Sequence, residues 1–573
     1  MTYRPDIQIL RAVAVVLVLL FHLEVPGFSA GFLGVDIFFV ISGYLMQTLY
    51  GEGTSAADFY RRRARRLLPA YFGLVVAVLI VCALVTLPSE FGDVAEQSLF
   101  AGALSSNIGF WLDESYFESG LFRPLLHLWS LGVEAQFYLL FPLLLWVKRP
   151  GLIVSAALSL LLCLAAVTVS PKLAFFMLPF RVWEFALGML VARVQGDRRL
   201  GLLAIAGMLL CLAIPVDGKA TSILVGHPAL PAAVITALTA LALACRVPRW
   251  AEESLVGRAA QKIGDASYSL YLAHFPVIVL LKYEPFSGTL LGFTPWTLPL
   301  IAVATVALYF GLERPGPRLF SARGSGAAIV SIWLLALALP RAQLLRFDER
   351  QRLIFAALDD RSAYRCGKLF RILHAGESFC PLGNGQPVLL VGDSHADSLK
   401  VSFARVAERH GCGAWLSVAN DPLLKPTLST RWLRQEADRL GARWVFLHFK
   451  KDHLSPELLE SARRELGGKL VVIEPTLEYA ESVPKLMYEG KQPKPLPPNG
   501  ELLAYLKAHP EIPVIGAAIP PSREGVPLYF DAGHLTLTGA RMLEPMLDAE
   551  FTGSVRQNSA GAPTSRSLCT LSD

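Results

Sequence analysis

Residues 7–25 form the apolar run IQILRAVAVVLVLLFHLEV, and this stretch decides the class of fold. A helix of about 20 mostly apolar residues is long enough to cross the hydrocarbon core of a bilayer. Similar runs continue to about Leu345, whereas the sequence from Arg346 onward has the composition of a soluble protein. The first run is too long for a signal peptide and is not followed by a small-residue cleavage site. We therefore predict a polytopic, all-α membrane domain followed by a soluble domain.

The composition of the whole chain agrees with a large membrane-embedded part. Of the 573 residues, 53% are hydrophobic and only 17% are charged. This balance excludes a disordered chain, a collagen-like chain and a single soluble domain of ordinary size. The net charge of +6 is small for this length, so we expect no binding to nucleic acid.

We predict eleven membrane-spanning helices from the lengths of the apolar runs. They lie at residues 7–25, 31–50, 67–88, 126–147, 151–169, 175–194, 200–215, 228–245, 266–283, 294–312 and 326–342. The predicted domains are 1–320 for the membrane part, 321–385 for the eleventh helix and a linker, 386–553 for the soluble domain and 554–573 for a flexible tail.

Lysine and arginine residues are distributed unequally between the predicted loops. With the N-terminus in the cytoplasm, eighteen of them lie in cytoplasmic segments and four lie on the opposite side. Cytoplasmic loops of membrane proteins carry an excess of positive charge, so this count favours that orientation. An odd number of spans then places the soluble domain outside the cytoplasm.

The cysteines of the soluble part support the same side of the membrane. Cys366 and Cys380 are fourteen residues apart, just ahead of the soluble domain. A disulfide between them would require an oxidising compartment, and two free thiols are the alternative. The other cysteines that lie in or beside apolar runs are expected to be small buried side chains: Cys82, Cys163, Cys211 and Cys245.

Strand and helix patterns alternate in the soluble part. Residues 387–391 are typical of a buried parallel strand, and residues 396–409 have helical periodicity. Further strands are predicted at 444–449, 470–473 and 514–517, and further helices at 455–466 and 538–550. We therefore predict a compact α/β domain with a mostly parallel sheet.

Ser394 lies between the first strand and the first helix of this domain, in the sequence Gly392-Asp393-Ser394-His395. A serine at this position suits a nucleophile, because backbone N–H groups at a helix N-terminus can stabilise an oxyanion. His534 could take the serine proton, and Asp531 could orient the imidazole. The alternative is a helix cap with no catalytic role.

These two blocks resemble the first and last blocks of the SGNH (GDSL-like) family of esterases and acetyltransferases. The resemblance implies a catalytic triad of Ser394, His534 and Asp531 on an SGNH-hydrolase-like fold. That family usually adds a glycine and an asparagine that donate to the oxyanion. Asn420 is the nearest candidate for the asparagine, and His448 follows the strand where the asparagine would be expected.

Two ionisable residues, Arg11 and His22, interrupt the first apolar run. They are eleven residues apart, which places them on one face of a helix at a separation of about 16 Å. Charged and ionisable side chains inside a membrane are costly and mark functional sites. The arginine suits a phosphate or carboxylate, and the histidine suits a general base or a transient acyl acceptor. The alternative is an arginine that snorkels and a histidine that is satisfied within the bundle.

This Arg-x10-His pair resembles the acyltransferase-3 family of membrane proteins. Other stretches agree with the family at residues 3–7, 31–44, 59–69, 126–138 and 267–276, so the resemblance covers about residues 1–320. A membrane part of this family followed by an SGNH-like domain is similar to bacterial O-acetyltransferases of surface glycans.

The resemblance implies an O-acetyltransferase that uses acetyl-CoA as acyl donor and holds no permanent cofactor or metal. Arg11 would bind acetyl-CoA from the cytoplasmic side together with Arg62, Arg63, Arg65 and Arg66, although these four are also explained by the positive charge of cytoplasmic loops. His22 would act in acyl transfer across the bundle. Polar residues of apolar runs could line an acyl channel, with structural pairing as the alternative: Glu134, Tyr138, Arg181, Glu184 and Tyr271.

The expected acceptor is a glycan on the periplasmic side of a bacterial inner membrane. Lipopolysaccharide O-antigen is the first expectation and peptidoglycan the second. Two other functions are a membrane-anchored carbohydrate esterase and a non-enzymatic glycan exporter. An anchor would not need the Arg11–His22 pair, and an exporter would not need Ser394 and His534.

Overall fold

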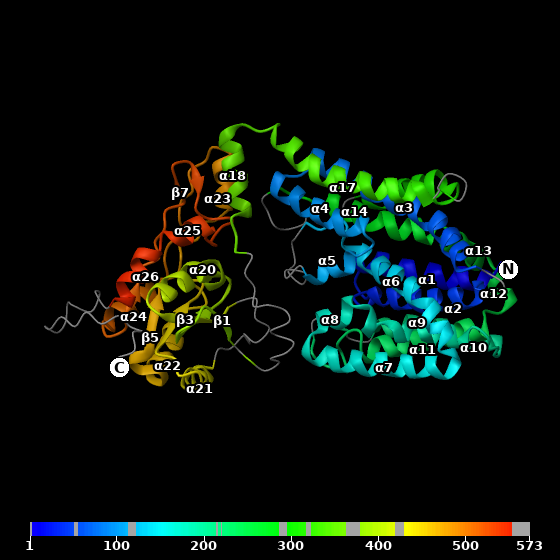
Figure 1. The fold of residues 1–573 in the computed structure, drawn as a ribbon, viewed down its shortest axis with the longest axis horizontal. Coiled ribbons are helices and arrows are strands. Elements are labelled where there is room, and N and C mark those ends of the chain that lie inside the picture. Colours follow the sequence, from blue (N-terminus) through cyan, green and yellow to red (C-terminus); the bar gives the residue numbers. More distant parts are fainter. Residues whose placement is uncertain are drawn as a thin grey trace. The chain divides into compact units, whose positions relative to one another are not determined.

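The computed structural model describes residues 3–50, 55–112, 122–213, 216–218, 220–285, 295–316, 322–362, 377, 379–418 and 429–552. The chain divides into two compact units, Met1–Gln343 and Leu344–Asp573 (Figure 1). The division lies beside the position at which the apolar runs of the sequence end.

The first unit is built from helices (Figure 1). Those of its first half are α1 (Pro5–His22), α2 (Gly34–Leu49), α3 (Ala56–Val85), α4 (Pro88–Gly102), α5 (Ser106–Leu112), α6 (Trp129–Trp146), α7 (Lys148–Val169) and α8 (Pro171–Phe176). Those of its second half are α9 (Val182–Val191), α10 (Arg198–Leu210), α11 (Leu230–Cys245), α12 (Arg249–Glu253), α13 (Leu255–Asp265), α14 (Ser267–Leu281), α15 (Thr297–Leu308) and α17 (Ala322–Leu344).

Six helices among the described residues are long and apolar enough to cross a membrane. They are Pro5–His22, Gly31–Leu49, Ala57–Val85, Leu126–Trp146, Lys148–Val169 and Gly324–Leu344. A seventh span would be formed by α13 and α14 together, with a bend of 71° between them. Each of the eleven predicted segments contains a helix, but the others are shorter, such as α9 and α11. Among the described residues, six helices, or seven with the bent pair, have the full length, compared with the eleven spans predicted.

A proline explains one of the shortened segments. The predicted span at 175–194 is divided between α8, which ends at Phe176, and α9, which begins at Val182. Pro179 lies between them in a 3₁₀ turn, and proline has no backbone N–H to continue a helix. The first helix is also shorter than predicted, so His22 is the last residue of α1 instead of an interior one.

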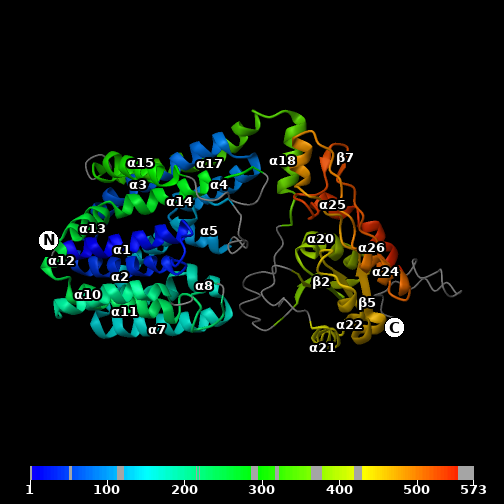
Figure 2. The same ribbon diagram turned by 180° about the vertical axis from the view of Figure 1, so that it is seen from behind.

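α1 and α2 lie in the middle of the first unit, between α3, α14 and α17 on one side and α7, α10 and α11 on the other (Figures 1 and 2). The crossing of α2 with α9 depends on two glycines. A Cβ on Gly43 would lie 1.9 Å from the carbonyl oxygen of Phe185, and one on Gly188 would lie 2.0 Å from that of Val40. Without side chains at these positions, the two backbones approach closely and gain van der Waals contact.

The second unit contains a six-stranded mixed sheet in the order β1–β3–β2–β4–β5–β6. Its strands are β1 (Cys380–Leu382), β2 (Gln386–Gly392), β3 (Cys412–Ser417), β4 (Trp444–His448), β5 (Leu470–Ile473) and β6 (Val514–Ile515). Neighbouring strands are parallel except for β1, which is antiparallel to β3. Two further strands, β7 (Ser522–Arg523) and β8 (Val526–Pro527), form a separate antiparallel pair.

Helices cover both faces of this sheet. The described helices of the second unit are α18 (Glu349–Asp359), α20 (Ser394–Arg409), α21 (Thr430–Arg439), α22 (Pro456–Leu466), α23 (Val483–Tyr488), α24 (Gly500–Ala508), α25 (Leu537–Arg541) and α26 (Glu544–Phe551), of which α18 packs against α23 and β8. Val388 and Leu390 of β2 pack in a core with α20, α25 and α26, whereas Leu389 and Val391 pack in a core with α21, α22 and α24. Alternate residues of β2 thus point into two different cores, as expected for a central strand buried on both faces.

The predicted strands of this part all overlap observed ones, but β1, β3, β7 and β8 were not predicted. The predicted helix at 538–550 is two helices, α25 and α26. Within the predicted linker at 321–385, α18 and β1 belong to the second unit.

Cys380 and Cys412 are both disulfide-bonded, so free thiols at these positions are excluded. In the β1–β3 ladder Cys380 lies opposite Leu416, which places Cys412 four residues, about 13 Å, farther along β3 and out of bonding reach. Cys366 lies outside the described residues, so the Cys366–Cys380 bond stays a prediction. The four cysteines of the first unit are free and buried, as predicted.

Candidate functional site

The geometry at Ser394 follows from the junction of β2 and α20. β2 ends at Gly392, and α20 begins at Ser394 with Asp393 as its N-cap. The Asp393 side chain accepts a hydrogen bond of 2.9 Å from the backbone N–H of His395. A Cβ on Gly392 would lie 1.8 Å from the carbonyl oxygen of His448, so only glycine allows β2 to pass β4 at this distance. Asp393 is therefore the helix cap, and the Ser394 hydroxyl is left for another role.

Ser394, His534 and Asp531 form a continuous hydrogen-bonded relay. His534 Nε2 lies 2.6 Å from Ser394 Oγ, and His534 Nδ1 lies 2.7 Å from Asp531 Oδ2. The other oxygen of Asp531 accepts hydrogen bonds of 2.8 Å from the backbone N–H groups of Gly533 and His534. This arrangement can transfer the serine proton to the imidazole and stabilise the imidazolium that results.

The pKa values of this relay suit that chemistry. Burial alone would raise the pKa of Asp531, but the hydrogen bond and charge of His534 outweigh burial and hold that pKa below its usual value. Burial alone would lower the pKa of His534, but its hydrogen bond to Asp531 and the negative charges of Asp531 and Asp393 together outweigh burial and raise that pKa. Asp531 is therefore a carboxylate that stabilises the protonated form of His534.

Two further histidines lie beside the relay. The ring of His395 lies 4.6 Å from that of His534 and 6.4 Å from that of His448. Burial, with repulsion from His534, lowers the pKa of His395 to about 3. Burial lowers the pKa of His448 to about 4, so both rings are neutral near pH 7. His448 Nδ1 lies 3.2 Å from the carbonyl oxygen of Ile473, which fixes its one proton there.

This geometry corrects the expectation for the oxyanion donor. Because the His448 proton is on Nδ1, its buried Nε2 has no proton to donate to an oxyanion. Asn420, the other candidate, lies outside the described residues. The N-terminus of α20, where Ser394 begins a sixteen-residue helix, is the electropositive group that the structure places at the nucleophile.

A cavity in the first unit brings together residues from five helices. It is lined by Arg11 of α1, Ser42 of α2, Arg63 and Arg66 of α3, Glu134 and Tyr138 of α6, and Tyr271 of α14, together with apolar residues that include Phe38, Phe39 and Leu45. Tyr138 and Ser42 both donate to Glu134 Oε1. Six of the residues predicted for donor binding or for a channel thus share one cavity.

The arginines of α3 divide into two groups. Arg63 and Arg66 line the cavity, whereas Arg62 and Arg65 do not. The guanidinium of Arg63 lies 5.6 Å from the centre of the Tyr138 ring, and its buried Nη2 has no hydrogen-bond partner among the described residues. A buried N–H without a partner is costly, so an anionic ligand in this cavity would be stabilised by Arg63.

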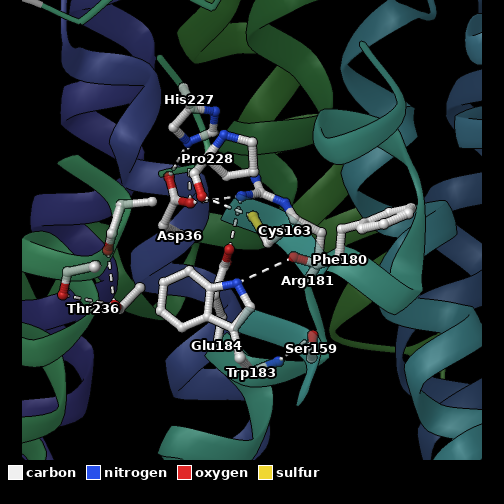
Figure 3. A network of polar contacts seen from close by, with 12 residues as sticks. Asp36, Ser159, Cys163, Phe180, Arg181, Trp183, Glu184, His227, Pro228 and Thr236 are labelled. Atoms are coloured by element: carbon white, nitrogen blue, oxygen red, sulfur yellow. Dashed lines mark hydrogen bonds and ion pairs between the residues drawn. The ribbon is translucent and has the colours of Figure 1, made fainter. Parts of the chain in front are cut away.

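Arg181 and Glu184 do not line this cavity. Both are fully buried, in a network with Asp36 of α2 and with His227 (Figure 3). Arg181 Nη1 lies 3.1 Å from Asp36 Oδ1 and 2.7 Å from Glu184 Oε1, and His227 Nε2 lies 3.1 Å from Asp36. The network ties α2 to α9, so the structural pairing considered as an alternative describes these two residues.

His22 contacts a second histidine, His274, which lies in the family-like stretch at residues 267–276. His22 Nδ1 lies 3.1 Å from Nε2 of His274, which is fully buried on α14. Tyr271 lines the cavity, and its ring lies 5.5 Å from that of His274. The signal that could have identified His274 is the one used for His22, an ionisable residue inside an apolar run.

Comparison with known proteins covers mainly the first unit. The family model of the acyltransferase-3 domain matches residues 4–314. The chain is 30% identical over 329 residues to the peptidoglycan O-acetyltransferase OatA of Listeria monocytogenes, which covers 48% of this chain and 50% of that protein. It is 30% identical over 314 residues to the O-acetyltransferase OatA of Staphylococcus aureus, which covers 49% and 51%. YrhL of Bacillus subtilis, provisionally named a peptidoglycan O-acetyltransferase, is 31% identical over 368 residues, which are 56% of each chain.

The chain spans about half the length of these three relatives, and no solved structure matches it. The family match covers more than half of this chain, and it includes α1 and every residue of the cavity. With the six apolar helices, this match establishes that the chain is a multi-pass membrane protein that belongs to the acyltransferase-3 family.

Proposed function

We propose that the chain moves an acetyl group from cytoplasmic acetyl-CoA to a hydroxyl of a glycan on the other side of the membrane. The observation that carries the proposal is one chain with two sites, an arginine-lined cavity in the acyltransferase unit and a Ser394–His534–Asp531 relay in the second unit. The thioester donor and the glycan acceptor lie on opposite sides of about 30 Å of hydrocarbon, so a single site could not contact both.

The cavity suits the chemistry of acetyl-CoA. Arg11, Arg63 and Arg66 provide positive charge for its phosphates, and the unpartnered Nη2 of Arg63 is a donor for a phosphate oxygen. The apolar side chains of the same cavity suit the pantetheine arm and the acetyl group. Arg62 and Arg65 contribute to the positive charge of α3 without lining the cavity.

His22 takes part in the first transfer, in one of two ways. As acyl acceptor, its unprotonated ring nitrogen forms a bond to the acetyl carbon while the C–S bond breaks and CoA leaves as a thiolate. As general base, it takes the proton of a hydroxyl that attacks the thioester. In both cases Arg11, about 16 Å away on the same face of α1, holds the donor and does not react.

Ser394 takes part in the second transfer, by the chemistry of an SGNH-like site. Ser394 Oγ forms a bond to the acetyl carbon while its proton moves to His534 Nε2, and His534 then gives this proton to the donor as the bond between donor and acetyl group breaks. A glycan hydroxyl then attacks the acetyl-serine and gives its proton to His534, which returns a proton to Ser394 Oγ as the bond between Oγ and the acetyl carbon breaks. Asp531 stays ionised throughout and stabilises the imidazolium. The acetyl group reaches Ser394 directly or through an intermediate carrier.

Two features support a second unit outside the cytoplasm. Cys380 and Cys412 are disulfide-bonded, and disulfides persist in oxidising compartments such as the bacterial periplasm. The excess of positive charge in the loops on the N-terminal side favours a cytoplasmic N-terminus. An odd number of spans, such as the seven that result when α13 and α14 together form one span, then places the second unit on the opposite side. A bacterial inner membrane with a periplasmic second unit satisfies both.

The acceptor is a cell-surface glycan. The names of two relatives favour peptidoglycan, whereas the arrangement of the two parts of the chain favours lipopolysaccharide O-antigen. Mass spectrometry of both glycans from a strain that lacks this protein distinguishes them, since only the true acceptor loses its acetyl groups.

Inside-out vesicles that contain the full chain test the proposal. With labelled acetyl-CoA added to the exposed cytoplasmic face, we expect release of CoA and label on a glycan inside the vesicle. His22→Ala should abolish the release of CoA, and Ser394→Ala should abolish the labelling of glycan. Wild-type labelling by Ser394→Ala would refute the two-site transfer, and a wild-type chain that consumes no acetyl-CoA would point to an esterase or an exporter.

A further inference from the structure

His22 is held by a residue 252 positions away in the sequence. His274 lies on α14, and its Nε2 lies 3.1 Å from Nδ1 of His22 at the end of α1. A neutral imidazole carries one N–H and one bare nitrogen, so a contact between two imidazole nitrogens needs a proton on one of them only. The partners of His274 decide which one.

The other nitrogen of His274 faces two backbone carbonyl groups. His274 Nδ1 lies 2.7 Å from the carbonyl oxygen of Tyr271 and 3.2 Å from that of Leu270. Carbonyl oxygens only accept hydrogen bonds, so Nδ1 of His274 carries its proton and Nε2 is bare. The bare Nε2 accepts, and His22 must therefore donate from Nδ1. The nitrogen that remains bare on His22 is Nε2.

We infer that His274 is a positioning residue that fixes the tautomer of His22, and that Nε2 is the reactive nitrogen of His22. This inference rests on the proposed role of His22 in acyl transfer. A general base and an acyl acceptor both need a bare nitrogen, and a hydrogen bond at the far nitrogen is what fixes its position. In a serine hydrolase a carboxylate makes that hydrogen bond. Here a neutral imidazole makes it, so no extra charge is buried among the helices.

The surroundings restrict His22 further. Its ring lies 4.7 Å from that of Phe275 and 5.0 Å from that of Phe21, measured between ring centres. A third histidine, His127, lies near His274 but hydrogen-bonds elsewhere, because its Nε2 lies 3.1 Å from the carbonyl oxygen of Leu272. Tyr271 connects the pair to the donor site, since its side chain lines the cavity and its carbonyl group anchors His274.

Three variants of the full chain in membranes test this role by the rate of CoA release. His274→Leu removes the acceptor, and we expect kcat to fall about 100-fold with KM for acetyl-CoA nearly unchanged, since the donor contacts remain. His274→Gln places an amide oxygen near the position of Nε2, and we expect it to restore kcat to within about tenfold of wild type. His127→Gln is the matched control and should keep wild-type kcat, because an amide can still donate to the Leu272 carbonyl group.

A wild-type kcat in His274→Leu would overturn the inference, as would equal losses in His274→Leu and His274→Gln. Solid-state NMR of the full chain with ¹⁵N-labelled histidine gives a readout that does not depend on turnover, with the His22 signals identified by their loss in His22→Asn. We expect a protonated Nδ1 and a bare Nε2 in the wild type, and a mixture of both tautomers in His274→Leu. A bare Nδ1 of His22 in the wild type, or a His22 tautomer that His274→Leu does not change, would refute the inference without contradicting the proposed function. Wild-type CoA release by His22→Ala would instead refute the proposed function.

Discussion

Asp531→Asn should inactivate the second unit by reversing the tautomer of His534. Asp531 Oδ1 accepts hydrogen bonds of 2.8 Å from two backbone N–H groups, those of Gly533 and His534. In the variant only the amide oxygen can accept these bonds, so the amide NH₂ must occupy the position of Oδ2, which lies 2.7 Å from His534 Nδ1. An NH₂ group donates, so Nδ1 must become bare and the proton must move to Nε2. Nε2 faces Ser394 Oγ at 2.6 Å and can then no longer take its proton.

In Ser-His-Asp triads this substitution lowers turnover by about 10⁴-fold with little change in geometry, or about 5 kcal/mol of transition-state stabilisation. We expect a loss of this size in the hydrolysis of a small acetyl ester by the full chain in detergent, where water replaces the glycan. Asp438→Asn is the matched control, because Asp438 makes surface ion pairs with Lys469 and Arg434 and should leave the rate unchanged. Less than a tenfold loss in Asp531→Asn would show that His534 is not the base for Ser394.

Three further predictions follow from the geometry. The pKa of His534 is raised, and the basic form of His534 is lost as the pH falls through that pKa. The rate of ester hydrolysis should therefore fall on the acid side at a pH above the usual histidine pKa of about 6.5. A fall that begins only below pH 6.5 would contradict this prediction. Gly392→Ala should lower the free energy of unfolding of the second unit by about 1–3 kcal/mol, measured with denaturant, because the added Cβ would lie 1.8 Å from the His448 carbonyl oxygen. Gly500→Ala is the control, since its Cβ would meet no atom within 4 Å and should leave the free energy of unfolding unchanged. Arg63→Ala should raise KM for acetyl-CoA about tenfold or more and leave kcat unchanged, because Arg63 lines the cavity. Arg61 is exposed, so Arg61→Ala should leave KM unchanged. Equal KM values in the two variants would show that Arg63 does not bind the donor.

The relay of the second unit could be predicted because its signals are local. A short apolar strand, a Gly-Asp-Ser turn and a helical pattern place Ser394 at the edge of the sheet, and the three-residue spacing of Asp531 and His534 lets both side chains turn toward one point. β3 was missed because Cys412–Ser417 contains a glycine at its second position and has no clear alternation of polar and apolar residues. β1 has only three residues and depends on pairing with β3.

In the first unit, sequence patterns predicted where helices lie but not which side chains meet. Arg181 and Glu184 resemble Glu134 in the sequence, as polar residues in apolar runs, yet only Glu134 lines the cavity. The difference comes from Asp36, 145 residues away, whose carboxylate pairs with Arg181 once α2 and α9 cross at Gly43 and Gly188. Such contacts depend on the packing of helices far apart in the sequence, and periodicity carries no information about them.

The two halves of the Arg-x10-His pair belong to different surroundings, and this separation fits an elongated donor. Arg11 lines the cavity with Arg63 and Arg66, whereas His22, about 16 Å along the same helix, contacts His274. Acetyl-CoA has the same polarity, with its phosphates at one end and its thioester at the end of the pantetheine arm. A donor with phosphates at the arginines and its arm directed past Tyr271 would bring the thioester toward the histidine pair. Binding of the phosphates by the arginines would then position the thioester carbonyl group, which the arginines do not contact. Substitution of Arg11 should therefore mainly raise KM, and substitution of His22 should mainly lower kcat.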